Sequence, residues 1–222
     1  MTAVSLVDQV TVQIRRSIIR GELTQGSRFS INELASRLNV SHIPVREALR
    51  RLETEGLVDL KPVKGAEVRP MNEQDLAGIY GLRLAIEPGL ASRGAVMLST
   101  ADIEELSSML AVYDEDSDVD REFELHQHFH LKIIRPAASE WDLRVLEHLW
   151  AANERYARLR FDTSDKPLQA ELHQVHQALV NAVASGSQEW VHAATIEHLK
   201  QNELAILAAM RRHREAAEPT AV

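Results

Sequence analysis

Apolar residues recur every three or four positions near the start of the chain, which is the spacing of one helix face. This pattern stops at Gly21, and it is carried by Val7, Val10, Ile14 and Ile18. A second apolar pattern follows Ser30, a residue type that caps helix N-termini, and its members are Ile31, Leu34 and Leu38. The pattern therefore predicts two helices before Asn39.

A tight turn and a further helix are predicted next. Asn39 tolerates the left-handed backbone conformation that such a turn needs. Ser41 can cap a helix that runs to about Thr54, with Pro44 confined to its first turn. The short helix, the turn and this second helix together predict a helix-turn-helix.

A β-hairpin is predicted directly after these helices. Two short strand-like segments, 57–60 and 66–69, flank a tip at 62–65. A helix-turn-helix followed by a hairpin is the layout of a winged helix-turn-helix. We assign this fold to residues 1–70 and call it the head.

Helical periodicity dominates the chain after Pro70. Asn72 can cap the first of about six helices, which we place at 73–97, 101–113, 118–136, 139–161, 166–184 and 187–213. The sequence contains no internal repeat and no low-complexity segment. It therefore predicts a mainly α protein, with the N-terminal head followed by an all-α bundle over residues 71–222.

Charge is divided unevenly along the chain. Residues 1–70 hold eleven Lys and Arg against eight Asp and Glu, a balance of +3, whereas the remaining residues hold fourteen against twenty-five, a balance of −11. Together they give the net charge of −8. A basic head on an acidic body fits a protein whose head alone meets a polyanion such as DNA, although chance variation between two domains gives the same numbers.

Composition excludes several kinds of site and location. The chain contains no cysteine, which rules out disulfides, thiolate nucleophiles and cysteine-bound zinc. It has no apolar run of about 18 residues, so we expect no membrane span. Residues 1–10 carry Asp8 and no Lys or Arg, unlike a secretory signal. We expect a cytoplasmic protein.

The predicted helix after Ser41 has two distinct faces. An apolar stripe suited to the core consists of Val45, Ala48, Leu49 and Leu52. Another face carries His42, Arg46 and Arg50, each four residues apart. Arginine in the major groove pairs with O6 and N7 of guanine, and flanking cations hold phosphates. A solvated surface helix can carry the same charges, so this face alone does not establish DNA binding.

The start of this helix and the hairpin tip add further candidate contacts. Ser41 and the first amides of the helix can meet a phosphate. Lys64 at the hairpin tip can reach the minor groove or the DNA backbone. Gly65 beside it permits close approach, because glycine has no side chain.

A longer ordered string of residues resembles the GntR family of bacterial regulators. It comprises Gly21-Glu22-Leu23, Gly26, Glu33-Leu34-Ala35, Leu38-Asn39-Val40-Ser41, Pro44-Val45-Arg46-Glu47-Ala48-Leu49, Leu52-Glu53, Glu55-Gly56-Leu57-Val58 and Gly65. The resemblance implies a DNA-binding head whose residues facing bases or phosphates are Asn32, Ser41, His42, Arg46, Lys64 and Gly65. Arginines are common in the family at the positions of Asn32 and His42, so we expect Arg46 to carry most of the direct readout.

Nine of the ten histidines lie at or after position 126. His126 and His130 are four residues apart on one predicted helix, so both imidazoles point the same way and can meet one metal ion. His173 and His176 share another predicted helix and His198 lies on the last, and two more histidines from neighbouring helices would complete a site inside the bundle. The competing interpretation is a set of ordinary surface or core histidines, which we expect of His128, His148, His192 and His213.

The helices after the head resemble the FCD effector domain of FadR-type regulators, through Phe129-His130, His176 and His198. That resemblance implies a divalent metal bound by His126, His130, His176 and His198. The family usually has an Asp or Asn at the position of His126, and an all-imidazole set favours Zn²⁺, Ni²⁺ or Co²⁺ over Mn²⁺. Alternatively, His126 hydrogen-bonds nearby and leaves three ligands plus water. His173, one turn before His176, supports the site from outside or lies at the surface.

Related domains place a small organic acid at the open positions of the metal. Arg83, Arg155 and Tyr156 lie on predicted helices and are the candidates to bind such a carboxylate effector. Arg83 is four residues from Glu87, and an intrahelical ion pair is the simpler interpretation for it. Arg155 is the better candidate, because arginine grips a carboxylate with two parallel hydrogen bonds.

These features favour a regulator over an enzyme. A metal-dependent hydrolase would need a base beside the ion, and the stretch 126–130 lacks the His-Glu-x-x-His string of a zinc protease. A regulator for which the ion itself is the signal is the closer alternative. We expect a homodimeric repressor whose two heads read a near-palindromic double-stranded operator, with an affinity that a small organic acid controls.

Overall fold

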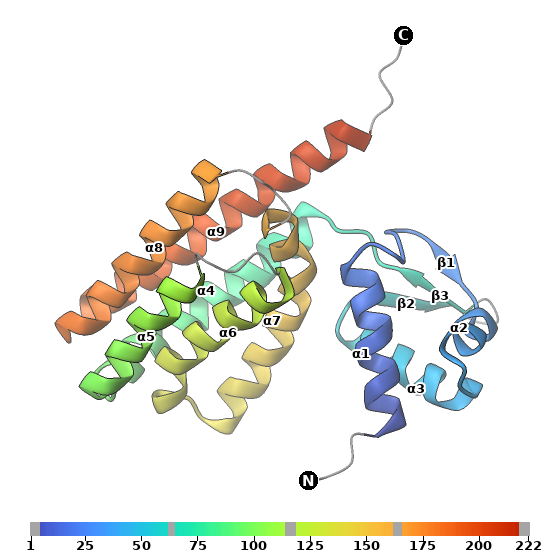
Figure 1. Ribbon diagram of the computed structural model, residues 1–222, viewed down its shortest axis with the longest axis horizontal. Coiled ribbons are helices and arrows are strands. Elements are labelled where there is room, and N and C mark those ends of the chain that lie inside the picture. The colour runs from blue at the N-terminus through green and yellow to red at the C-terminus, as the bar shows by residue number, and fades with distance from the viewer. Residues whose placement is uncertain (1–4, 62–64, 114–118, 162–165, 218–222) are drawn as a thin grey trace. The chain divides into compact units, whose positions relative to one another are not determined.

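The computed structural model describes residues 5–61, 65–113, 119–161 and 166–217, and within these the side chains of 111–113, 119–123, 160–161, 166–172 and 216–217 are left undescribed. The chain divides into two compact units, residues 1–72 and residues 73–222. The first unit contains short helices and a small sheet, and the second contains long helices (Figure 1).

The first unit has the element order of a winged helix-turn-helix. Its elements are α1 (Leu6–Ile19), β1 (Arg28–Phe29), α2 (Ile31–Leu38), α3 (His42–Thr54), β2 (Val58–Lys61) and β3 (Gly65–Val68). The strands form an antiparallel sheet in the order β1-β3-β2, with Phe29 and Leu60 both paired to Ala66. The predicted helices and hairpin are present, and β1 is an additional strand that the sequence analysis did not predict.

Local sequence explains where these helices begin and end. At the start of α2, the Ser30 hydroxyl accepts from the Glu33 amide at 3.1 Å while the Glu33 carboxylate accepts from the Ser30 amide at 2.6 Å. Asn39 ends α2 in the left-handed conformation with φ of 52°, as predicted. Ser41 occupies the N-cap position of α3, but its side chain makes no capping hydrogen bond there, so the expected cap of α3 is wrong in that detail.

The core of the first unit lies mainly between α1 and α3. Its buried side chains include Val10 and Ile14 of α1 and Val45, Leu49 and Leu52 of α3. Ion pairs also join these helices at 2.6 Å between Arg51 and Asp8 and at 2.5 Å between Arg15 and Glu55. The Ser5 hydroxyl and the Arg51 guanidinium both lower the pKa of Asp8 below its ordinary value.

Gly65 is required by the packing of the sheet. Its φ is +88°, and a Cβ added there would lie 2.1 Å from the Phe29 carbonyl oxygen. The backbone of β3 therefore approaches that of β1 more closely than any side chain allows. This gives Gly65 a structural role in addition to any approach to DNA.

The second unit is all-α within the residues that the structure describes. Its elements are α4 (Glu73–Ala95), α5 (Thr100–Tyr113), α6 (Val119–Ile134), the 3-10 turn η1 (Arg135–Ala137), α7 (Glu140–Phe161), α8 (Lys166–Ser185) and α9 (Gln188–Ala217). These match the six predicted helices, with ends that differ by up to four residues; α4, for example, ends at Ala95 and not at 97. α6 stops at Ile134, because Pro136 lacks the amide needed to continue an α-helix, and α9 extends past residue 213.

Helix α4 is central to the second unit. It packs against α9, α6 and α7, while α8 packs against α9 and α5 (Figure 1). The core includes Leu90 of α4, Ile133 of α6, Leu146 of α7 and Leu179 of α8. None of the helices in the described parts of the chain combines the length and apolar character needed to cross a bilayer.

Candidate functional site

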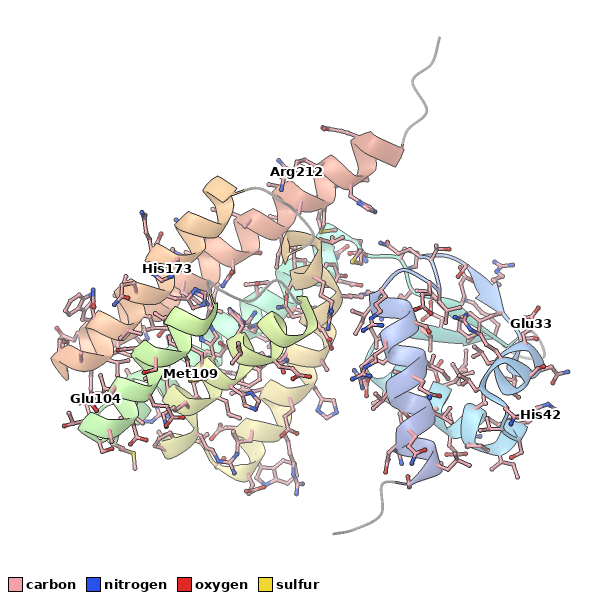
Figure 2. All side chains as sticks on the ribbon, in the orientation of Figure 1. Glu33, His42, Glu104, Met109, His173 and Arg212 are labelled. Atoms are coloured by element: carbon pink, nitrogen blue, oxygen red, sulfur yellow. The ribbon has the colours of Figure 1, made fainter. Side chains whose placement is uncertain are left out.

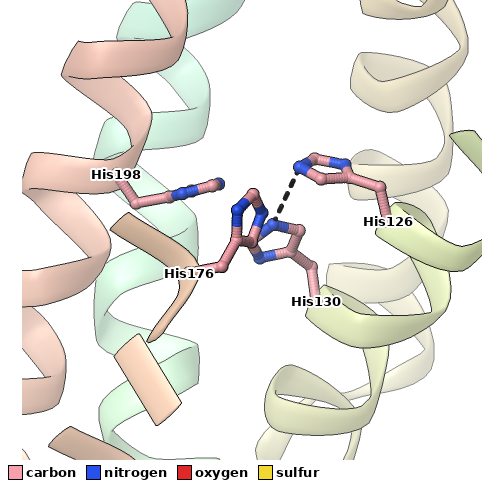
Figure 3. A group of neighbouring side chains, drawn as sticks. All are labelled: His126, His130, His176 and His198. Carbon is pink, nitrogen blue, oxygen red and sulfur yellow. Dashed lines mark hydrogen bonds between the residues drawn. The ribbon is translucent and has the colours of Figure 1, made fainter. Parts of the chain in front are cut away.

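Four imidazole rings from three helices converge in the second unit (Figure 3). His126 and His130 project from α6, His176 from α8 and His198 from α9. One ring nitrogen of each lies within 4.8 Å of the corresponding atoms of the others. His130, His176 and His198 are buried, and His126 is half-buried. The structure thus brings together the four histidines that the resemblance to FCD domains implied.

The rings pack closely enough to constrain one another. The Nε2 atoms of His126 and His130 are 3.2 Å apart, so one ring donates to the other in a tautomer-dependent hydrogen bond. The ring of His198 lies with its centroid 4.5 Å from those of both His130 and His176. Phe129, with its ring 5.4 Å from that of His176, gives the cluster an apolar neighbour.

The chemistry of this donor set fits a divalent transition metal. Tetrahedral bonds of about 2.0–2.1 Å from one ion to imidazole nitrogens place those nitrogens about 3.3–3.4 Å apart. The ring nitrogens are up to 4.8 Å apart, so side-chain rotation has to bring them closer together around an ion. Neutral imidazoles suit zinc, nickel and cobalt, whereas harder ions prefer oxygen ligands.

Asn202 is a member of this site that sequence reasoning missed. It lies one turn after His198 on α9, is 3% exposed, and places its amide nitrogen 2.8 Å from Nε2 of His198. If the oxygen and nitrogen of this amide exchange places, the amide oxygen accepts a hydrogen bond from a protonated Nε2 of His198. In either orientation Asn202 fixes the angle of the His198 ring. The signal for it was the spacing of four residues from a predicted ligand.

Arg83 and Glu87 form a buried ion pair on α4. The Arg83 Nε lies 2.6 Å from Oε1 of Glu87, and the side chains are 3% and 1% exposed. Trp150 of α7 donates to the same carboxylate oxygen at 2.9 Å. Burial alone would lower the pKa of Arg83, but the Glu87 carboxylate raises it above the ordinary value. The intrahelical pair that the sequence favoured for Arg83 is therefore present.

Arg155 and Tyr156 are also buried, at 8% and 1% exposed, on α7. Arg155 donates from Nη2 to the Tyr156 hydroxyl at 3.3 Å, and its guanidinium carbon is 5.0 Å from the Tyr156 ring centroid. Asn153, two residues earlier, is buried as well. A buried guanidinium and phenol on one helix offer a carboxylate several hydrogen-bond donors.

The remaining histidines of the second unit lie further out. Those expected to be ordinary surface or core histidines are all exposed, namely His128, His148, His192 and His213. His173 of α8 is half-buried (Figure 2). His130, His176 and His198 therefore differ from the exposed histidines in their burial, whereas His173 is half-buried like His126.

In the first unit, the predicted DNA-facing side chains of α3 point to solvent. Val45, Ala48, Leu49 and Leu52 are fully buried on one side of the helix. The exposed residues are Ser41, His42, Arg46 and Arg50, together with Asn32 on α2 (Figure 2 labels His42). Arg50 donates to Glu47 at 2.8 Å, so it has to exchange this partner to reach a phosphate. Lys64 lies outside the described residues.

Both units match known protein families. Residues 6–68 match the sequence profile of the bacterial regulatory proteins, gntR family, and residues 78–201 match that of the FCD domain. The segment matched to gntR proteins contains α2 and α3, and the segment matched to FCD domains contains the four clustered histidines.

Individual relatives agree with these matches. The chain is 28% identical over 191 residues to the HTH-type transcriptional repressor RspR of Escherichia coli K12, covering 85% of this chain and 83% of that protein. It is 32% identical over 195 residues to the uncharacterized HTH-type transcriptional regulator BphR of Paraburkholderia xenovorans, covering 83% and 78%. The solved structure of E. coli McbR/YncC superposes with a TM-score of 0.77 at 22% identity, over 95% of this chain and 99% of that one. The two sequence relatives are named as regulators of transcription, not as enzymes.

Proposed function

Because the chain belongs to the gntR family of bacterial regulatory proteins and carries an FCD domain behind its DNA-binding head, we propose that it is a metal-dependent repressor controlled by a small organic acid. Regulation of transcription by DNA binding is the function of this family. The observation that carries the finer proposal is the convergence of four imidazoles from α6, α8 and α9. A buried set of this composition is suited to hold an ion to which an acid coordinates.

We assign operator recognition to the exposed face of α3. Arg46 pairs with a guanine in the major groove, and the first amides of α3 meet a phosphate together with Ser41. The remaining proposed contacts are Asn32, His42, Arg50, Lys64 and Gly65. We assign Arg50 to a phosphate and not to a base, because its guanidinium can exchange the Glu47 carboxylate for a phosphate without any change in the helix.

We assign the metal to His126, His130, His176 and His198. When bound, a divalent ion such as zinc or nickel supplies open coordination positions that accept a carboxylate oxygen. The chain's own part is to hold the imidazoles in place. Asn202 orients His198 through its amide, as outer partners of metal ligands commonly do.

Arg155 and Tyr156 are the groups we propose for the carboxylate end of the effector. The Arg155 guanidinium lies 3.3 Å from the Tyr156 hydroxyl, so a buried charged donor and a buried hydroxyl stand together where a carboxylate can accept from both. Arg83 would have to release Glu87 first, and this buried pair makes it the weaker candidate.

The assembly we propose is a homodimer that represses transcription. Two heads related by two-fold symmetry read two half-sites of a near-palindromic double-stranded operator. The relative RspR is named a repressor, which supports repression over activation for this protein. A protein of this kind acts in the cytoplasm, where the bacterial chromosome lies.

The proposal is tested by measuring operator affinity in the metal-free protein, with zinc or nickel alone, and with metal plus a panel of small carboxylates. We expect a carboxylate to change the affinity only when metal is present. An effect of metal alone, with none from any acid, would instead establish the ion as the signal. Arg46→Ala should weaken operator binding by about 1–3 kcal/mol, and unchanged sequence-specific binding by this variant would refute the assignment of α3.

A further inference from the structure

Ile43 is an exposed apolar residue at the start of α3. It is the second residue of the helix His42–Thr54, and it is 75% exposed. It is the most exposed of the large hydrophobic side chains among the described residues. Single exposed apolar residues are common on proteins, so its significance depends on where it lies.

Helix geometry places Ile43 directly opposite the core. Successive residues turn by about 100°, so the buried residues of α3 lie on an arc centred about 270° from His42. The opposite direction is at about 90°, and Ile43 and Arg50 lie at about 100° and 80°. Arg46, at about 40°, is their neighbour on the same arc. Ile43 thus projects from the middle of the face assigned to the operator.

The residues around Ile43 argue against a protein partner. Its neighbours on that arc are His42, Arg46, Glu47 and Arg50, which are polar and exposed. An apolar protein interface would need a contiguous patch, whereas one apolar side chain among cations fits a surface that is mostly polar. The major groove is such a surface, because its edges carry hydrogen-bonding groups and, at thymine, a single methyl group.

We propose that Ile43 reads a pyrimidine 5-methyl group, that of thymine, in each operator half-site. This inference rests on the proposed function, in which the N-terminal part of α3 enters the major groove. Isoleucine suits the role, since its branched side chain is nearly fixed in one rotamer on a helix and loses little freedom on contact. In this arrangement Arg46 specifies a guanine through hydrogen bonds, and Ile43 specifies a neighbouring thymine through its methyl group.

The experiment begins with an operator selected by the wild-type protein from a random duplex library. Each thymine in one half-site is then replaced by uracil, which removes only the methyl group. We expect one position at which wild-type affinity falls about fourfold, the loss of one buried methyl contact. Elsewhere in the half-site the replacement should have little effect. Placing cytosine and 5-methylcytosine at that position separates the methyl group from the rest of the base.

The variant Ile43→Ala should bind the thymine and uracil operators equally, because the contacting side chain is gone. Val12→Ala is the matched control, since Val12 is an exposed apolar residue on α1, and it should discriminate as the wild type does. Arg46→Ala should weaken all operators that contain its guanine. Suppose that Arg46→Ala weakens binding, but that removing a thymine methyl group changes the affinities of the wild type and of Ile43→Ala equally at every position. The methyl readout is then wrong and the proposed function stands. If Arg46→Ala has no effect, the DNA-reading assignment itself fails.

Discussion

Histidines on the same helix of this protein differ sharply in their surroundings. His128 lies between His126 and His130 in sequence, yet it is exposed, while His130 is 5% exposed and contacts other rings. Spacing alone was enough to predict that His126 and His130 share a direction, because residues four apart on a helix do so. Spacing could not reveal that His176 and His198 arrive at the same point, since that depends on how α8 and α9 pack.

The partners of functional residues were the least predictable feature. Trp150 and Glu87 are 63 positions apart and meet only because α7 packs against α4. Asn202 and Ile43 passed unnoticed for another reason: neither belongs to a residue type that the motifs sought. Asn202 is significant because it is buried, and Ile43 because it is exposed. The burial of an individual residue cannot be read directly from one sequence.

His130→Ala should abolish stoichiometric metal in the purified protein, because it removes one buried imidazole from the centre of the cluster. DNA binding should remain in the absence of effector. The measurement is elemental analysis of protein purified without added chelator, beside an operator-binding assay. His128→Ala is the matched control and should keep its metal. Equal metal contents in the two variants would mean that the histidine cluster is only structural.

Glu87→Leu should destabilise the protein by about 3–5 kcal/mol, because it leaves the buried Arg83 guanidinium without its carboxylate. Glu47→Leu, which breaks the exposed pair with Arg50, should cost less than about 1 kcal/mol. Urea denaturation monitored by circular dichroism compares the two. Adding Arg83→Met to Glu87→Leu should restore much of the loss, since no charge is then buried alone. A Glu87→Leu protein as stable as the wild type would contradict the importance of the pair.

At the scale of elements, periodicity located the helices well and their ends less well. The predicted helix 118–136 ends at Ile134 in the structure, because Pro136 turns the chain into η1. Strand β1 escaped prediction for a different reason. Two residues, Arg28 and Phe29, carry no periodicity, and they form a strand only because β3 lies beside them.

Helix packing at Gly94 leads to an element-scale prediction. A Cβ at Gly94 of α4 would lie 2.1 Å from the carbonyl oxygen of Ile133 on α6, whereas one at Gly78 of the same helix would meet nothing within 4 Å. Gly94→Ala should therefore lose about 1–3 kcal/mol by forcing α4 and α6 apart. Gly78→Ala should gain about 0.5–1 kcal/mol, because alanine favours a helix interior over glycine.

Thermal denaturation of the two glycine variants checks this contact. The melting temperature should fall for Gly94→Ala and rise for Gly78→Ala. Metal content should also fall in Gly94→Ala, because α6 carries His126 and His130. Should both variants melt at the same temperature, α4 and α6 would not depend on the absence of a side chain at Gly94.

At the scale of the whole molecule, the two kinds of site lie in different units. The clustered histidines belong to α6, α8 and α9 of the second unit, and the proposed base contacts belong to α2 and α3 of the first. Each unit has its own hydrophobic core. The proposed effector can therefore change how the two heads of a dimer are spaced or oriented without unfolding either unit. It does so if it binds one arrangement of the heads more tightly than another.

The proposed dimer, with one head in each subunit, makes operator geometry a test of the assembly. Half-sites of such operators lie about one helical turn, 10–10.5 base pairs, or a multiple of it apart, so both face the same side of the duplex. Inserting five base pairs between them turns one half-site to the far side and should reduce affinity to nearly that of a single half-site. Inserting ten restores the facing and should weaken binding less.

Electrophoretic mobility shifts with the native, five-insert, ten-insert and single-half-site duplexes measure these affinities, and sedimentation gives the mass of the free protein. Arg46→Ala should lower the affinity for the native and ten-insert duplexes and reduce the dependence on spacing, because it weakens the specific contact in both half-sites while phosphate contacts remain. If the five-insert duplex binds as tightly as the native operator, the dimer does not hold its two heads at a fixed spacing and orientation. Control of DNA binding by an effector would then have to act within one head, which contains none of the clustered histidines.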